Sequence, residues 1–202
     1  MGLTRRFVLV LLLLSYSAWG LASISPSMRI KQTVDEVLTV LSSPELDRDK
    51  RRDMVRIIVR PRFDYRAMSQ IILAKNWKKA STEQQDRFIY LFRDLLEHTY
   101  FSAMDKYTGE RIRMGREKLN GKRAVVQTYI ATSSKEVPVN YNMRLKNDDW
   151  YAYDVSIDGV SLVSNYRTSF RNLVREKGMD GLLLELEKKV DSLKTKPLQE
   201  GK

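Results

Sequence analysis

The apolar residues of this chain recur with two different periods, and the order of these periods limits the possible folds more than any other feature. Between residues 30 and 107 they recur every three to four positions, as on one face of a helix. Between 110 and 157 they alternate with polar residues, and helical spacing returns at 162. Strands joined by short turns, with helices before and after, predict an α+β domain in which helices pack on a twisted antiparallel sheet of about four strands.

Capping residues divide the first half of the chain into four predicted helices. Ser43-Pro44 is typical of an N-cap followed by proline in the first turn, and Asp64 can cap the next helix. Ser81 and Gln84 have the spacing of a capping box and should open a long helix that ends at Gly109. The residues expected to face inward on the second helix are Leu46, Met54, Ile57 and Ile58.

Turn residues delimit the predicted strands. Asn120-Gly121 should join strands near 110–119 and 123–133, and Asn147-Asp148 should turn the chain again. Pro138 cannot donate to a ladder, so its stretch is expected at an edge or a bulge. The side chains expected on the inner face of the last strand are Tyr151, Tyr153, Val155 and Ile157.

A final helical region follows Gly159, and Ser161 is the candidate cap for its first helix. Gly178 is a natural C′ residue and Asp180 a natural N-cap, so a second helix should follow. We expect a flexible basic tail over residues 192–202.

The N-terminus has the order of a secretory signal peptide. Arg5 and Arg6 precede the apolar run 7–14, and small residues follow at Gly20 and Ala22. Cleavage after Ala22 would leave residues 23–191 as a single domain followed by the tail. The chain contains no cysteine, which excludes lipoprotein acylation and disulfides.

The formal net charge is +11, and it remains +9 without Arg5 and Arg6. Such a charge favours anionic partners, namely nucleic acid, anionic lipid head groups or an acidic protein. Export makes nucleic acid the least favoured of the three. The charges are also widely scattered, and a simply solvated surface is the alternative.

Residue types with catalytic potential are sparse. His98 is the sole histidine, and without cysteine it cannot build a typical zinc site. Ser161 lacks the second glycine of a nucleophile elbow. Asp154 and Asp158 could form an acid pair, but no third group is placed near them. We therefore expect no enzymatic activity, no metal and no cofactor.

Aromatic residues are frequent for so basic a chain, which suggests either dense core packing or the lining of an apolar pocket. Phe88, Phe92, Tyr100 and Tyr107 share one face of the long helix. Arg167 lies at the rim of the apolar stripe that follows Ser161. It should either pair with Asp154 or Asp158, or bind an anion.

Two segments resemble the MlaC family of periplasmic phospholipid-binding proteins, which also includes toluene-tolerance components of ABC transport systems. The segment "WYAYDVSIDGVSLVSNYRTSF", followed by "GMDGLLLELEKKV", is similar to the C-terminal signature of the family. The segment "NWKKASTEQQDRFIYLFRDLLEHTY" is similar to its long aromatic helix. The resemblance covers roughly residues 27–190, and "SID" before Gly159 is a modest departure from the commoner aliphatic-acidic pair.

The resemblance implies an NTF2-like fold whose apolar cavity, between sheet and helices, holds the acyl chains of a phospholipid cargo. The implied role is a monomeric periplasmic carrier in a Gram-negative bacterium. It would shuttle lipid between an inner-membrane ABC transporter, with its membrane-anchored substrate-binding subunit, and an outer-membrane lipoprotein and porin complex. The residues expected to contact lipid are Phe88, Phe92, Tyr100, Val139, Tyr141, Met143, Tyr153, Tyr166 and, near the mouth, Arg167. Two other hypotheses remain, an adaptor with a solid core and a secreted protein that binds nucleic acid or other polyanions.

Overall fold

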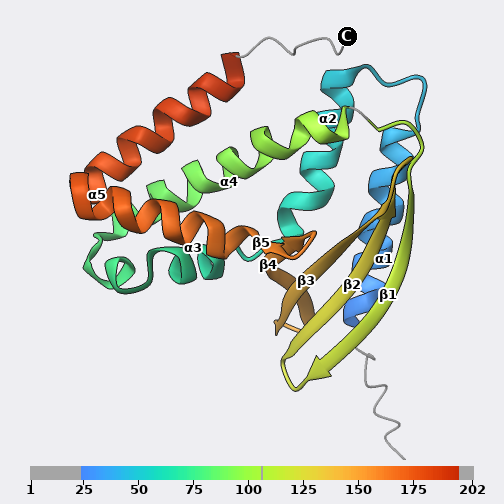
Figure 1. Ribbon diagram of the computed structural model, residues 1–202, viewed down its shortest axis with the longest axis horizontal. Coiled ribbons are helices and arrows are strands. Elements are labelled where there is room, and N and C mark those ends of the chain that lie inside the picture. Colours follow the sequence, from blue (N-terminus) through green and yellow to red (C-terminus); the bar gives the residue numbers. More distant parts are fainter. Residues whose placement is uncertain (1–23, 106, 196–202) are drawn as a thin grey trace, which may run out of the picture.

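A computed structural model describes residues 24–105 and 107–195 of the chain. Helices precede and follow a single block of strands, as the change of period predicts (Figure 1). The elements are α1 (Pro26–Leu41), α2 (Arg48–Val59), η1 (Arg60–Arg62), α3 (Tyr65–Leu73), η2 (Ala74–Lys79), α4 (Thr82–Met104), β1 (Arg111–Asn120), β2 (Arg123–Ala131), β3 (Glu136–Lys146), β4 (Asp149–Ile157), β5 (Val160–Ser161) and α5 (Leu162–Thr195).

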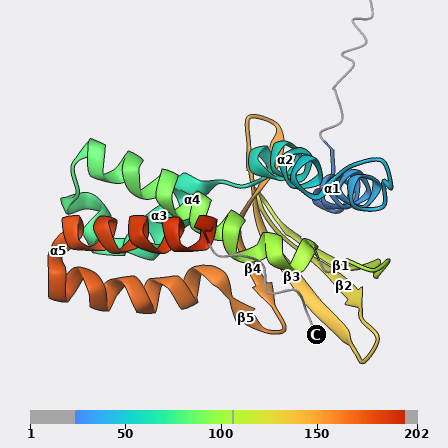
Figure 2. The ribbon, with the colours of Figure 1, turned by 90° about the horizontal axis from the view of Figure 1, so that it is seen from above.

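The strands form one antiparallel sheet in the order β1-β2-β3-β4-β5. Helix α1 packs against β1 and β2, whereas α3, α4 and α5 pack mainly on one another, and α3 and α5 reach the sheet at β4. Figure 2 shows these two groups of elements side by side. The α+β class and the antiparallel sheet are therefore confirmed, with the two-residue β5 added to the four strands expected.

Side-chain caps fix three of the helix starts. Asp64 accepts a hydrogen bond from Ala67 N at 2.9 Å, and the Ser81–Gln84 capping box forms in both directions at 3.1 and 3.2 Å, as predicted. The predicted start of the second helix at Ser43-Pro44 is wrong. Its cap is Asp47, whose carboxylate accepts from Lys50 N at 2.8 Å and lies next to the helix N-terminus.

The inner face of α2 also differs from the prediction. Val55 is fully buried, whereas Met54 is 41% exposed and Ile57 is 73% exposed. Moving the helix start along the chain does not change which residues of α2 share a face. Arg56 of α2 binds Glu97 of α4, whereas Met54 and Ile57 lie on the exposed side of the helix.

Both predicted hairpins form. Gly121 and Lys122 are the two turn residues between β1 and β2, and Asn147 and Asp148 adopt positive φ angles of 50° and 59° between β3 and β4. The expectation that Pro138 lies at an edge is wrong, because β3 is a central strand. Its carbonyl accepts from Asp158 N at 2.9 Å, so its nitrogen faces the end of β4, where the ladder stops and no donor is required.

A β-bulge changes which side chains of β4 face inward. Asn142 pairs with Asp154 and Met143 pairs with Ala152, so Tyr153 has no partner on β3. The extra residue reverses the alternation. Trp150 and Ala152 are consequently buried before the bulge, and the predicted inward orientation of Tyr151 and Tyr153 is wrong.

Helix α5 consists of two segments joined at Gly178, whose φ of 71° interrupts the helix where a C′ glycine was predicted. The second segment continues to Thr195, four residues beyond the expected end of the domain. The predicted signal peptide, residue 23 at the start of the predicted mature chain, and the last seven residues lie outside the described residues. Among the described residues, no helix combines the length and apolar character that crossing a membrane requires.

Candidate functional site

The N-terminus of α5 is held by a small hydrogen-bond network. Ser161 Oγ donates to Asp154 Oδ2 at 2.7 Å and accepts from Ser164 N at 3.0 Å. Val163 N donates to Asp154 Oδ1 at 3.1 Å. Ser161 is therefore a helix cap, as expected, and Asp154 completes it from the neighbouring strand. The network fixes the direction in which α5 leaves the sheet and so places Tyr166 against α4.

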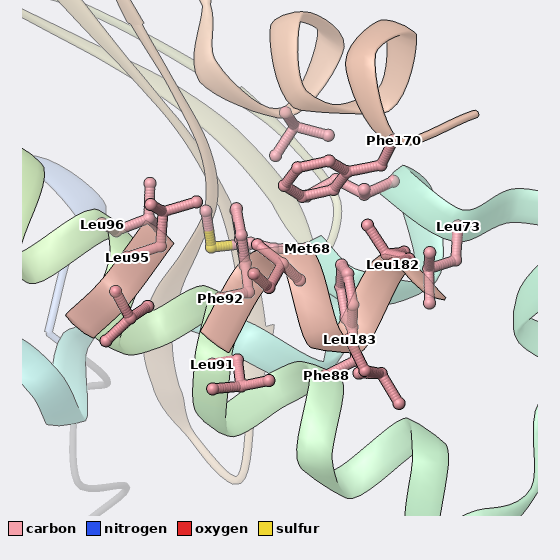
Figure 3. Close-up of a cluster of buried hydrophobic side chains, with 14 residues drawn as sticks. Met68, Leu73, Phe88, Leu91, Phe92, Leu95, Leu96, Phe170, Leu182 and Leu183 are labelled. Carbon is pink, nitrogen blue, oxygen red and sulfur yellow. The ribbon is translucent and has the colours of Figure 1, made fainter. Parts of the chain in front are cut away.

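The aromatic residues of α4 and α5 form the centre of a helical cluster (Figure 3). The rings of Phe88 and Phe92 stack with centroids 5.8 Å apart, and Phe170 meets the Phe88 ring edge-on at 5.8 Å. Tyr166 meets Phe92 edge-on at 5.3 Å. Phe88 and Phe92 are fully buried, so protein side chains already cover them.

Tyr100 and Tyr166 lie at the boundary of this helical cluster. Both side chains are half-buried, and burial raises the pKa of each phenol above its ordinary value. They keep accessible apolar surface at the end of the cluster, unlike Phe88 and Phe92.

Three of the four predicted sheet residues, Val139, Tyr141 and Met143, lie together on the inner face. Tyr141 is flanked across the ladder by Val126 and Val155, and Met143 by Ala124 and Ala152. Val139 and Met143 are buried, whereas Tyr141 keeps some accessible surface although burial raises its pKa.

The two remaining predicted residues lie elsewhere. Tyr153 occupies the bulge, away from the row that contains Trp150 and Ala152. Arg167 is exposed and makes no ion pair with any described residue. The two carboxylates proposed as its partners are engaged elsewhere, Asp154 with the helix cap and Asp158 with Lys135.

The buried apolar residues that the structure describes form three separate clusters. One joins α3, α4 and α5, one lies between α1 and the sheet, and a small one lies between α1 and α2. Packed domains usually have one contiguous core with minor satellites. Here the helical aromatic cluster and the sheet cluster are distinct. Of the predicted lipid-contacting residues, Phe88, Phe92, Tyr100 and Tyr166 pack in the first and Tyr141 and Met143 in the second.

Charged residues connect α2 and η1 to α4. Glu97 accepts from Arg56 Nε at 2.9 Å and from Arg60 Nη2 at 2.8 Å, and its side chain is only 8% exposed. The bond from Arg60 to Glu97 raises the pKa of the guanidinium. Asp94 adds a contact with Arg93 at 3.1 Å.

A cavity of about 150 Å³ lies beside this connection, between the first half of α2 and the residues that follow α4. Figure 1 shows the start of α2 next to the end of α4. Arg48, Arg51 and Arg52 contribute to its lining together with Asp105, which Arg52 binds through both carboxylate oxygens. Its apolar lining residues are Leu41, Val55, Met104 and Tyr107.

Sequence reasoning missed these arginines. The available signal was the basic run "RDKRRD", in which three arginines occur within five residues. Aspartates alternate with the basic residues in this run, so its charge pattern is that of an ordinary solvated helix face and does not indicate a binding site.

His98 lies on α4 outside this cavity. Burial lowers its pKa below the ordinary value of 6.5, so it is neutral at pH 7. Among the residues that the structure describes, no three of the types His, Cys, Asp and Glu converge as metal ligands.

Comparison with known proteins relates the whole domain to one family. The family described as MlaC protein matches residues 31–188. The intermembrane phospholipid transport system binding protein MlaC of Haemophilus influenzae is 22% identical over 191 residues, covering 90% of this chain and 88% of that protein. The toluene tolerance protein ttg2D of Pseudomonas putida is 25% identical over 186 residues, covering 89% and 86%.

A solved structure shares the fold. The phospholipid-binding protein from Ralstonia solanacearum, in complex with a phospholipid, superposes with a TM-score of 0.78 at 24% sequence identity. The match covers 85% of this chain and 100% of the other. The sheet and helices described above are therefore the architecture of a protein that has been seen with lipid bound.

Proposed function

This chain is a member of the MlaC family, and on that premise we propose that it is a periplasmic phospholipid carrier without catalytic activity. Its relatives include a binding protein of an intermembrane phospholipid transport system and a toluene tolerance protein. The Ralstonia protein of the same fold holds a phospholipid. The cargo we propose is accordingly a phospholipid, carried without any cofactor.

The observation that carries this proposal is the separation of the helical cluster from the sheet cluster. Tyr100 and Tyr166 pack against the first as partly buried residues, and Tyr141 packs against the second. Acyl chains placed between these surfaces would join the clusters into one apolar interior. Phe88 and Phe92 then support the helical wall from behind, with Val139 and Met143 in the sheet wall.

The structure modifies the predicted set of contacts. Tyr153 occupies the bulge and Arg167 is exposed, so neither is expected to touch the acyl chains. We assign Arg167 to the outer surface of α5, where an anionic group of a docking partner could reach it.

The energetics explain why such a cavity is needed. Exposing acyl chain to water costs about 0.8 kcal/mol per methylene, so two tails cost on the order of 20 kcal/mol. A carrier must cover both tails and still release them, so docking must favour an open state. We propose that a monomer receives or delivers lipid at an inner-membrane ABC transporter, through its membrane-anchored substrate-binding subunit, and at an outer-membrane lipoprotein and porin complex.

Native mass spectrometry of protein purified without detergent, combined with lipid extraction, tests the proposal. We expect phospholipid at a fixed stoichiometry. Protein that is free of lipid and also takes up none from vesicles would indicate the adaptor hypothesis instead.

Two matched tryptophan substitutions on β2 locate the site. Alternation along β2 places Ile130 on the same face as the buried Ala124, Val126 and Thr128, and Val125 on the opposite face. We expect Ile130→Trp to reduce lipid uptake by filling accessible space on the inner face, and Val125→Trp to leave it unchanged. Equal uptake by both variants would contradict a cavity on this face of the sheet.

A further inference from the structure

The β1–β2 hairpin ends in a group of side chains that play no part in enclosing the proposed cargo. We call this group the basic hairpin end, and its members are Arg116, Lys118 and Leu119 of β1, Lys122 of the turn and Arg123 of β2. All five side chains are exposed. Figure 1 shows the hairpin turn at the lower end of the sheet, away from α3, α4 and α5, so a partner can reach it without meeting those helices.

The positive charges of the basic hairpin end are not neutralised. None of its four basic side chains forms an ion pair with a residue of the described chain. The carboxylate of Glu117 in the same strand accepts from Ser27 N at 2.8 Å, so it serves the N-terminus of α1 instead. The adjoining β3–β4 turn adds only the exposed carboxylate of Asp148, and a surplus of positive charge remains.

The position of Arg123 makes this surplus unfavourable for the sheet itself. Its register partner on β3 is Arg144, and like charges directly opposite each other destabilise a sheet. Asp64 compensates Arg144, whereas Arg123 has no carboxylate among the described residues. Lys118 lies on the same face, because it pairs with Val125, two residues from Arg123. The arrangement therefore favours an anion that a partner supplies.

Leu119 adds an apolar side chain to these cations. It pairs with Ala124, yet it is 59% exposed and belongs to none of the three apolar clusters of the described chain. In the interfacial region of a bilayer, cations meet anionic head groups while apolar side chains meet acyl chains. A bilayer offers both at every point of its surface, whereas an acidic protein would need an apolar pocket in register with its carboxylates.

We propose that the basic hairpin end docks the protein on the surface of a membrane that contains anionic phospholipid. A second copy of the chain does not fit, because a two-fold interface would place the same positive charges against one another. The inference goes beyond the proposed carrier function, since binding to a bilayer surface does not depend on a bound cargo. Docking of this kind holds the protein at a bilayer without a protein partner.

Sedimentation with vesicles tests the docking site. The protein is mixed with sucrose-loaded vesicles of phosphatidylcholine, either alone or with an equal amount of phosphatidylglycerol, and the bound fraction is measured. We expect binding to the anionic vesicles only, and weaker binding at high salt, because salt screens exposed charges. Equal binding to the two kinds of vesicle, or binding to neither, would overturn the proposal.

Two charge-matched double variants locate the site. Lys118→Gln combined with Arg123→Gln should lower partitioning onto anionic vesicles about 25-fold, at about fivefold for each basic residue. Lys189→Gln combined with Arg171→Gln removes the same two residue types from exposed positions of α5, which also lack ion pairs within the described chain. This control should change partitioning by less than about twofold. Equal losses in the two double variants would show attraction by net charge alone and overturn the hairpin site.

Leu119→Ser tests the apolar contact separately and also serves if the first double variant folds poorly. It should lower partitioning about fivefold and leave the salt dependence unchanged. Partitioning equal to that of wild type would contradict insertion into the bilayer and overturn the assignment to a membrane.

Poly-glutamate supplies the last arm of the experiment. Binding to poly-glutamate that depends on Lys118 and Arg123, without binding to anionic vesicles, would show an acidic protein partner and overturn the assignment to a membrane. Bound phospholipid is measured in the same samples. Protein that lacks phospholipid but still binds anionic vesicles through these residues supports the docking site and contradicts the carrier function alone.

Discussion

Replacing Glu97 by glutamine should destabilise the protein strongly, because Glu97 is the acidic centre that joins α2 and η1 to α4. Its two carboxylate oxygens accept from Arg56 and Arg60, and Arg93 lies 4.0 Å away. Glutamine has nearly the same shape but no charge. The substitution therefore leaves the packing intact and removes the counter-charge of two arginines.

The burial of the groups sets the magnitude. Removing one partner of a fully buried ion pair costs about 3–5 kcal/mol. The arginines here are partly hydrated, with side-chain exposures of 23% for Arg56 and 38% for Arg60, so we expect about 2–3 kcal/mol. For a domain of this size each kcal/mol lowers Tm by about 2–4 °C. The predicted decrease in Tm is therefore about 4–12 °C.

Thermal and urea unfolding of the variant and wild type measure the effect. Glu187→Gln is the matched control, since Glu187 accepts from Arg87 at 2.7 Å but both side chains are about half exposed. Its free energy of unfolding should change by less than about 0.5 kcal/mol. If Glu97→Gln unfolds no more easily than Glu187→Gln, the ion cluster does not hold α2 on α4 and the reasoning fails.

Three further predictions follow from single residues. Asp154→Ala removes two hydrogen bonds at the start of α5 and should lower the free energy of unfolding by about 1–2 kcal/mol. Asp154→Asn should lose less stability. Equal Tm values for Asp154→Ala and wild type would contradict the capping role. The pKa of His98 is lowered in the folded state, so the unfolded state binds the proton more tightly. The contribution of His98 to the free energy of unfolding is therefore complete above pH 6.5, and it declines as the pH falls through the lower pKa of the folded state. His98→Gln should therefore lose less stability than wild type between pH 7.5 and 5.5 in urea titrations, and parallel curves would refute the effect. Gly178→Ala forces a side chain into φ 71° and ψ −174° and should cost about 1–3 kcal/mol, measured as a lower urea midpoint, with an unchanged midpoint as the contrary result.

Local features were the part of the fold that could be predicted from sequence. Ser81, Gln84 and Ser161 act as caps because their short-range hydrogen bonds depend on residues three positions apart. The hairpin turn at Gly121 likewise depends on one local backbone preference. Such signals survive in any fold that contains the element, so no tertiary knowledge was required.

The candidate site was predicted less well because its membership depends on pairing and packing. Tyr153 was placed inward by alternation, but the bulge opposite Asn142 and Met143 reversed the phase of β4. Phe88 and Phe92 lie on the predicted face, yet Phe170 and Tyr166 cover them from α5. In the sequence Arg51 is one charge among many. Only the packing of α2 beside the end of α4 shows that it lines a cavity.

The sequence by itself determined the order of helices and strands, the caps and turns, and the family signature, because each is encoded by period or by neighbouring residues. The tertiary structure alone decided that the apolar residues separate into distinct clusters, and that arginines of α2 line a cavity together with apolar side chains. Those facts depend on contacts between residues far apart in the chain, such as Arg52 and Asp105. Only the closed fold sets their distances and removes water from between them.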